Sequence, residues 1–98
     1  MDFKLTYTQR ALRNLAEIIE HIAIDDALAA SRFGTSLLDH LELLTRFPRM
    51  GAEISERRGV RKLIHSPILV YYRFHESHGL IQILHLRHAA RKPPKSLR

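Results

Sequence analysis

The chain has 98 residues, a formal net charge of +6 and no cysteine, and 45% of its residues are hydrophobic. This composition is typical of one globular domain and argues against an intrinsically disordered chain. The lack of cysteine excludes disulfide bonds, thiolate catalysis and Cys-ligated zinc sites, and no apolar run approaches the ~18 residues of a membrane span. We therefore expect residues 1–98 to form a single cytoplasmic domain that binds no membrane.

The first half of the chain predicts a strand followed by two helices. Alternating apolar residues are typical of a short strand over residues 2–7. Apolar residues at helical spacing then predict one helix that ends near Ile24 and a second that ends near Phe47, before Pro48. The very short connection between them predicts an antiparallel helical hairpin. Candidate N-caps are Thr6 or Thr8 for the first helix and Asp25 or Asp26 for the second.

The last third of the chain changes to the period of strands. Residues 60–65, 68–75 and 80–88 are rich in β-branched, aromatic and leucine side chains, and short turns separate them. This pattern predicts a three-stranded antiparallel meander. A helical hairpin packed on one antiparallel sheet gives an α+β fold of two layers. We expect residues 49–59 to form a polar loop and residues 91–98 a basic tail.

Side-chain alternation predicts which residues form the core. Between residues 68 and 75, the even-numbered side chains form the better core face. The pairing of the last strand stays open, because an even hairpin loop places Ile81 and Ile83 beside Phe74, whereas an odd loop places the even-numbered residues 80–84 there. The residues expected in the core between hairpin and sheet are Leu15, Ile18, Ile22, Phe33, Leu37, Leu41, Val70 and Tyr72.

Basic residues are concentrated in the second half of the chain. Residues 1–47 carry a net charge of −2 and residues 48–98 a net charge of +8. Twelve of the sixteen basic residues are arginine, which binds phosphate and carboxylate groups in a bidentate manner. This asymmetry favours a binding face for a polyanion or an acidic partner. One such target-binding surface is predicted from Arg61, Lys62, Arg73, Arg87, His88 and Arg91.

Short motifs follow one another along nearly the whole chain. They are Leu5-Thr6 leading to Ala11-Leu12-Arg13-Asn14-Leu15, Ala30-Ser31-Arg32-Phe33, Leu44 with Pro48 and Gly51, Gly59-Val60-Arg61-Lys62-Leu63, Val70-Tyr71-Tyr72-Arg73-Phe74, and Ile81 to Arg91. Together and in this order, they resemble the ParE/RelE superfamily of type II toxin–antitoxin toxins. The resemblance implies a RelE/ParE-like fold and a small bacterial toxin that a cognate antitoxin silences.

The resemblance implies one of two activities, and a shared fold does not choose between them. The first hypothesis, which the ParE-like ending favours, is a toxin that inhibits DNA gyrase without being an enzyme. The second is a RelE-like endoribonuclease that cuts mRNA on the ribosome, for which the catalytic candidates are Arg73, His88 and Arg91. RelE-type toxins place a catalytic arginine where this chain has Leu69, and Arg73 lies roughly 13 Å further along the strand. A third hypothesis is an inactive module that only binds its antitoxin.

Seven histidines raise the question of a metal site. His75 and His78 flank a predicted turn, and His85 and His88 stand at an odd separation on a strand, which places them on opposite faces. Cysteine is absent and carboxylates are scarce in this third of the chain. We therefore predict no metal site and no cofactor.

The apolar residues exceed what one core between hairpin and sheet can cover. Several of them flank the main helical stripes or lie on the second face of the predicted sheet, where an extended or helical segment of another protein can bury them. We expect an acidic antitoxin as this partner, with a homodimer as the alternative use of the same surface. The predicted antitoxin-binding residues are Leu12, Ile19, Leu38, Leu43, Leu69 and Tyr71.

Overall fold

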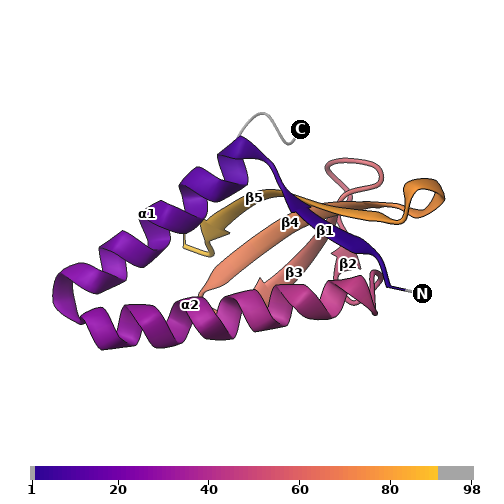
Figure 1. Cartoon of the computed structure of the whole chain (residues 1–98). Coiled ribbons are helices and arrows are strands. Elements are labelled where there is room, and N and C mark those ends of the chain that lie inside the picture. The colour runs from indigo at the N-terminus through magenta and orange to yellow at the C-terminus, as the bar shows by residue number, and fades with distance from the viewer. Residues whose placement is uncertain (1, 91–98) are drawn as a thin grey trace.

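The computed structural model describes residues 2–90 and confirms the predicted order of one strand, two helices and a meander of strands (Figure 1). The elements are β1 (Lys4–Tyr7), α1 (Gln9–Asp25), α2 (Ala27–Glu42), the 3-10 helix η1 (Leu43–Thr45), β2 (Ala52–Glu53), β3 (Arg61–His65), β4 (Ile68–His75), the 3-10 helix η2 (Glu76–His78) and β5 (Leu80–His88). The predicted basic tail, residues 91–98, lies outside the described residues.

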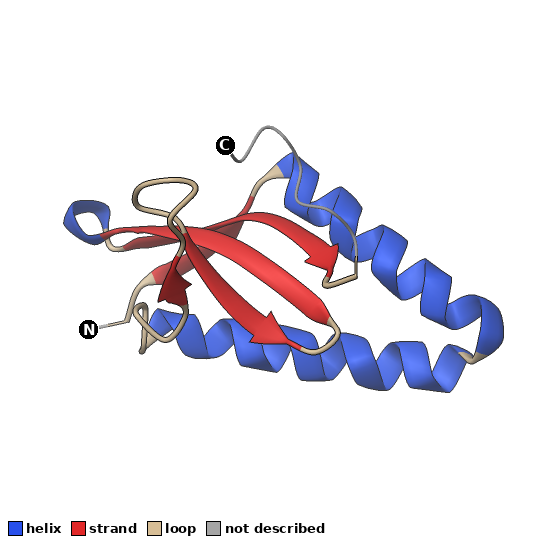
Figure 2. Cartoon of the chain, turned by 180° about the vertical axis from the view of Figure 1, so that it is seen from behind, coloured by secondary structure: helices blue, strands red, loops and turns tan. Residues whose placement is uncertain are grey.

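The described strands form one sheet in the order β1-β5-β4-β3-β2. β3, β4 and β5 form the predicted antiparallel meander, whereas β1 pairs with β5 in parallel. The sheet is therefore mixed, and β1 is one of its edges. The two helices form a V on one side of the sheet, and Figure 2 shows the strands from the opposite side. This arrangement confirms the predicted α+β fold of helices layered on a sheet.

The short strand β2 lies in the segment that was predicted to be a loop. Ala52 and Glu53 pair in antiparallel fashion with Lys62 and Arg61 of β3. The prediction of a loop throughout residues 49–59 was therefore wrong at these two positions. Two residues are too few for side-chain alternation to reveal a strand.

A β-bulge settles how the last hairpin pairs. Ile81 lies opposite Phe74, which agrees with the alternative of an even hairpin loop. A register shift between Tyr71 and Tyr72 then skips Leu84 of β5. Because one extra residue reverses the alternation, the even-numbered residues of β5 face the core beyond the bulge.

Side-chain caps fix the start of both helices. Thr8 caps α1 and Asp26 caps α2, each accepting a hydrogen bond of 3.0 Å from the backbone N–H three residues later. Thr6, the alternative cap for α1, instead donates its hydroxyl to the carbonyl of Ile81 at 3.0 Å. α2 ends at Glu42, earlier than predicted, because the chain tightens there into η1. Within residues 2–90, no helix is long and apolar enough to cross a lipid bilayer.

The main core lies between the two helices and the sheet, and half of the predicted core residues are fully buried in it. The four that are buried are Leu37, Leu41, Val70 and Tyr72. The four that are only partly buried are Leu15, Ile18, Ile22 and Phe33. Leu15, Ile18 and Phe33 pack against the core, so the prediction was wrong only in expecting full burial there. Ile22 lies toward the closed end of the helical hairpin, which extends beyond the sheet and where Ile24 is 80% exposed (Figure 1).

A smaller apolar cluster lies on the face of the sheet that carries no helix. Val60, Leu69 and Tyr71 are buried in it, and Ile54 and Leu84 pack against them. The segment between β2 and β3 supplies Ile54 and Val60, which a backbone hydrogen bond of 3.1 Å joins. This segment therefore covers part of the face that the sequence predicted to be open.

Candidate functional site

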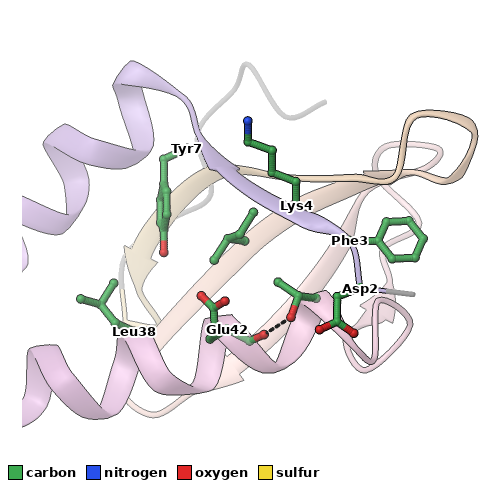
Figure 3. Close-up of a pocket in the computed structure, with 8 residues that line it drawn as sticks. Asp2, Phe3, Lys4, Tyr7, Leu38 and Glu42 are labelled. Atoms are coloured by element: carbon green, nitrogen blue, oxygen red, sulfur yellow. Dashed lines mark hydrogen bonds between the residues drawn. The ribbon is translucent and has the colours of Figure 1, made fainter.

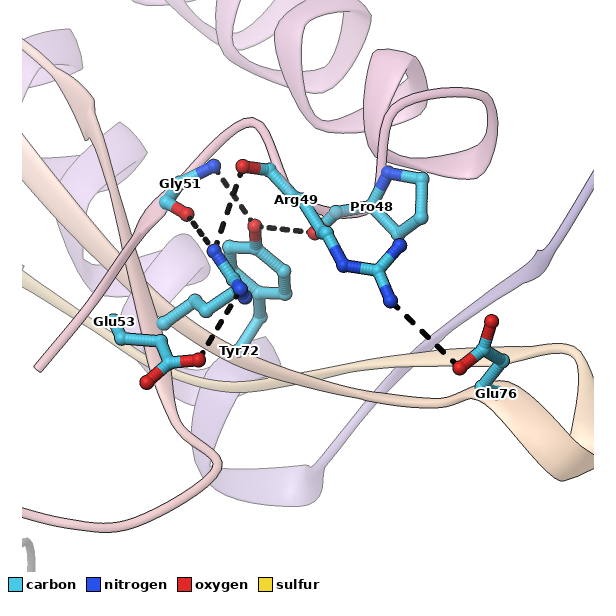
Figure 4. A network of polar contacts seen from close by, with 7 residues as sticks. Pro48, Arg49, Gly51, Glu53, Tyr72 and Glu76 are labelled. Atoms are coloured by element: carbon cyan, nitrogen blue, oxygen red, sulfur yellow. Dashed lines mark hydrogen bonds and ion pairs between the residues drawn. The ribbon is translucent and has the colours of Figure 1, made fainter.

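A polar network joins the centre of the sheet to the segment that follows η1 (Figure 4). The Tyr72 hydroxyl donates to the carbonyl of Pro48 at 2.7 Å and accepts a hydrogen bond from the N–H of Gly51 at 2.9 Å. The Arg61 guanidinium donates to the carbonyl of Gly51 at 2.7 Å and to the carboxylate of Glu53 at 3.3 Å. Burial raises the pKa of Tyr72, which keeps the hydroxyl protonated and able to donate.

Gly51 allows this close approach of loop and sheet. A Cβ atom at its position would lie 2.7 Å from the Tyr72 ring and 2.8 Å from the carbonyl oxygen of Lys62. The Arg61 guanidinium also lies 5.7 Å from the centroid of the Phe74 ring, and the Arg61 side chain is only 16% exposed. Arg61 was predicted to contact a target, but both of its terminal nitrogens donate to groups within the molecule. It positions the loop.

The sequence did not predict this network, although each of its central residues belongs to a motif. Pro48 and Gly51 form one motif, and Arg61 and Tyr72 belong to two others. The available signal was Tyr72 itself, because a tyrosine assigned to the core needs a partner for its hydroxyl. The sequence alone does not indicate that this partner comes from Pro48 and Gly51, which precede Tyr72 by 24 and 21 residues.

The structure divides the predicted basic surface between the two faces of the sheet. Arg61 and His88 lie opposite core residues of β4, which places both on the helix-covered face because cross-strand partners share a face. Lys62, Arg73 and Arg87 lie on the other face, all three partly exposed. We call these three residues the outer basic cluster.

A buried histidine adjoins this cluster. The His85 ring stacks on Tyr71 with 5.6 Å between ring centroids, and the Arg87 guanidinium donates to the Tyr71 hydroxyl at 3.1 Å. His85 Nδ1 lies 2.9 Å from the side-chain oxygen of Asn14 and donates to it, because an amide oxygen only accepts. Burial, followed by the charges of Arg10 and Arg87, lowers the pKa of His85 to about 4. The ring is therefore uncharged at neutral pH.

The candidates of the ribonuclease hypothesis are not assembled within the described residues. Arg73 and His88 lie on opposite faces of the sheet, and Arg73 donates to the carbonyl of Arg58 at 3.4 Å. Arg91, the third candidate, lies outside the described residues. Leu69, which stands where the resemblance expects a catalytic arginine, is buried in the cluster on the helix-free face.

The predicted antitoxin-binding residues differ in exposure. Three of them are 43–47% exposed in the helical layer: Leu12, Leu38 and Leu43. Ile19 instead contributes to the contact between the helices, since a Cβ on Gly34 would lie 3.2 Å from its Cδ1 atom. Leu69 and Tyr71 are buried, which corrects the expectation that they are open to a partner.

A groove of about 520 Å³ lies between β1 and the end of α2 (Figure 3). Its lining consists of Asp2, Phe3, Lys4, Leu5, Tyr7, Leu38, Glu42 and Thr45. Burial, and then the charge of Glu42, raise the pKa of Tyr7. The backbone N–H of Phe3 donates to the carbonyl of Thr45 at 2.8 Å and joins the two walls. An edge strand beside an exposed leucine is a surface that a segment of another protein can use.

Comparisons with known proteins agree with this architecture. A family model described as the ParE toxin of type II toxin–antitoxin system, parDE, matches residues 5–93. The chain is 32% identical over 88 residues to Toxin RelE2 of Caulobacter vibrioides, which covers 90% of this chain and 97% of that protein.

Two solved structures have the same fold. The chromosomal ParDE toxin–antitoxin system of P. aeruginosa matches with a TM-score of 0.75 and 24% identity, covering 88% of this chain and 95% of that one. The toxin–antitoxin complex RelBE2 of Mycobacterium tuberculosis matches with a TM-score of 0.70 and 19% identity, covering 93% of this chain and 95% of that one.

Proposed function

The chain belongs to the ParE family of type II toxin–antitoxin toxins, and we propose that it inhibits DNA gyrase by binding it, with no enzymatic activity of its own. The observation that supports this choice is the placement of Arg73 and His88 on opposite faces of the sheet. Cleavage of RNA needs a base and a group that stabilises the phosphate charge at one phosphodiester. A toxin that acts by binding needs no such assembly.

We assign the target contact to the outer basic cluster. Lys62, Arg73 and Arg87 lie on the face that the helices leave open, and the neighbouring loop adds the exposed Arg57 and Arg58. A positive surface of this kind is complementary to an acidic patch on a protein partner and accelerates the encounter with it.

The antitoxin contact is assigned to the helical layer instead. Leu12, Leu38 and Leu43 are exposed apolar side chains, and Leu38 also lines the groove beside β1. We propose that a segment of a cognate, acidic antitoxin buries these leucines and occupies the groove. Raising the salt concentration should slow its association more than it speeds its dissociation, because charges at the rim act chiefly on the on-rate.

The second candidate function is the cutting of mRNA on the ribosome. The identity of 32% to a protein named Toxin RelE2 favours it. On this hypothesis, Arg73 and His88 cannot act together on one phosphodiester, because they lie on opposite faces of the sheet. Other residues would have to supply the catalytic groups.

Two assays on the purified chain separate the hypotheses. The first measures supercoiling by gyrase, and the second measures translation in vitro with mapping of mRNA ends. Loss of supercoiling with intact mRNA is the expected result. Ribosome-dependent mRNA cleavage with normal supercoiling would overturn the proposal. Binding of the antitoxin with neither effect would instead identify an inactive antitoxin-binding module.

A pair of charge reversals tests the target surface. Arg73→Glu on the helix-free face should weaken inhibition of gyrase by about tenfold or more, which corresponds to roughly 1.4 kcal/mol of binding free energy. Arg32→Glu makes the same change of charge at an exposed position on α2 and serves as the matched control. Equal inhibition by the two variants would show that the outer basic cluster is not the target contact.

A further inference from the structure

Two histidines that are far apart in sequence meet where α2 crosses the end of β3. The Nδ1 atoms of His40 and His65 lie 2.8 Å apart, and their ring centroids are separated by 5.0 Å. The Phe33 and His65 rings form a T-shaped pair with 5.4 Å between their centroids, and Ser36 Oγ lies 3.4 Å from His65 Nε2. Both histidines are partly exposed, so that solvent reaches the pair.

The contact between His40 and His65 places two nitrogen atoms close enough to bind one metal ion. A neutral imidazole has one nitrogen that donates and one that accepts, so the two facing Nδ1 atoms share a single proton. Release of that proton to solvent frees a lone pair on each Nδ1 for a metal ion beside the line that joins them, provided that each imidazole carries its own proton on Nε2. For His65 the Ser36 hydroxyl oxygen lies where it can accept that N–H, in the place that a carboxylate, carbonyl or water takes behind most metal-bound histidines.

The separation of the two nitrogen atoms agrees with coordination to one ion. Bonds from zinc to histidine nitrogen measure about 2.0–2.1 Å, so two such ligands at a right angle lie about 2.8–3.0 Å apart. The observed Nδ1–Nδ1 separation of 2.8 Å is at the lower end of this range. Right angles between neighbouring ligands occur in the square-planar and octahedral geometries of Cu²⁺ and Ni²⁺.

We propose that His40 and His65 form a two-nitrogen binding site for a late divalent transition-metal ion. Imidazole ligands select such ions over Mg²⁺ and Ca²⁺, and Cu²⁺ binds more tightly than Ni²⁺ or Zn²⁺. Within residues 2–90, no group of three or more histidine, aspartate or glutamate side chains is placed so that it could hold a metal ion. Water therefore completes the coordination, and the bound ion ties α2 to β3.

The proposal is tested by titrating the untagged protein with Cu²⁺ and Ni²⁺ and measuring affinity by calorimetry. His40→Gln and His65→Gln should each weaken binding by about tenfold or more, since even the loss of an outer-shell partner costs that much. The double variant His75→Gln/His78→Gln removes two other histidines, whose rings lie 6.4 Å apart beside η2, and should bind as the unmodified chain does. Equal affinity in all three variants, or loss of binding only in the double variant, would overturn the proposal.

Two further measurements keep the test valid if a histidine variant folds poorly. Electron paramagnetic resonance of Cu²⁺ on the His75→Gln/His78→Gln variant counts the bound imidazole nitrogens, and two are expected. Ni²⁺ should raise the unfolding temperature of this variant, and further increases should follow the logarithm of the Ni²⁺ concentration, whereas Mg²⁺ should leave the temperature unchanged. A spectrum without two nitrogen ligands, or identical effects of Ni²⁺ and Mg²⁺, would refute the site.

Discussion

Removing the Tyr72 hydroxyl tests whether the polar network holds the loop after η1 against the sheet. Tyr72→Phe keeps the buried ring but leaves the carbonyl of Pro48 and the buried N–H of Gly51 without this partner. A hydrogen bond contributes about 1 kcal/mol net, and an unsatisfied buried group costs roughly 1–3 kcal/mol. We therefore expect the free energy of unfolding to fall by about 2–3 kcal/mol, which corresponds to roughly 10–20 °C in the unfolding temperature of a domain of this size.

The assay is chemical denaturation followed by circular dichroism, with Tyr71→Phe as the matched control. The Tyr71 hydroxyl accepts one partly buried hydrogen bond, from Arg87, so that its loss should cost about 1 kcal/mol or less. Gly51→Ala disturbs the same contact from the other side, because its Cβ would lie 2.7 Å from the Tyr72 ring, and should destabilise the protein as well. A loss below about 0.5 kcal/mol for Tyr72→Phe would refute the assignment of a structural role to the network.

Two other predictions concern the core and the buried histidine. Leu37→Ala should cost roughly 2–5 kcal/mol in urea denaturation because Leu37 is fully buried, whereas the partly buried Leu15→Ala should cost clearly less; equal losses would contradict the described helix faces. The folded-state pKa of His85, about 4, lies below its ordinary value of 6.5, so this residue's stabilising contribution is complete above pH 6.5 and is lost as the pH falls toward 4. The variant His85→Phe should therefore lose less stability between pH 6.5 and pH 4 than the exposed control His88→Gln does, and unchanged acid sensitivity would contradict a buried neutral ring.

Most of the fold follows from the period of apolar residues in the sequence. The spacing of Leu37 and Leu41 assigns the buried face of α2, and alternation assigns Val70 and Tyr72 to the core face of β4. The pairing of β5 does not follow from the sequence, because the bulge inserts one residue and no local pattern reports it. Periodicity places Leu15 on the apolar side of α1, where it packs against the core, but periodicity does not report how completely each residue on that side is covered.

The site was less predictable because exposure depends on segments that are distant in sequence. Leu69 and Tyr71 lie on the second face of the sheet as alternation requires, but Ile54 and Val60 from another segment pack against them. The pairing of His40 with His65 has the same origin, since 25 residues separate the two and only the packing of α2 on β3 brings their rings together. Contacts over such separations require the tertiary structure.

The polar network also explains why the motifs that identify the family do not identify the molecule that the toxin acts on. Pro48, Gly51, Arg61 and Tyr72 are motif residues, and each contacts another of them in the network that attaches the loop to the sheet. The Tyr72 and Arg61 side chains and the backbone groups of Pro48 and Gly51 maintain the fold, so that a chain with a different target would need these residues equally. Differences in target should instead depend on side chains outside the network. In this chain the outer basic cluster lies outside the network. Charge reversal in this cluster is therefore a more informative test of function than substitution of the network residues.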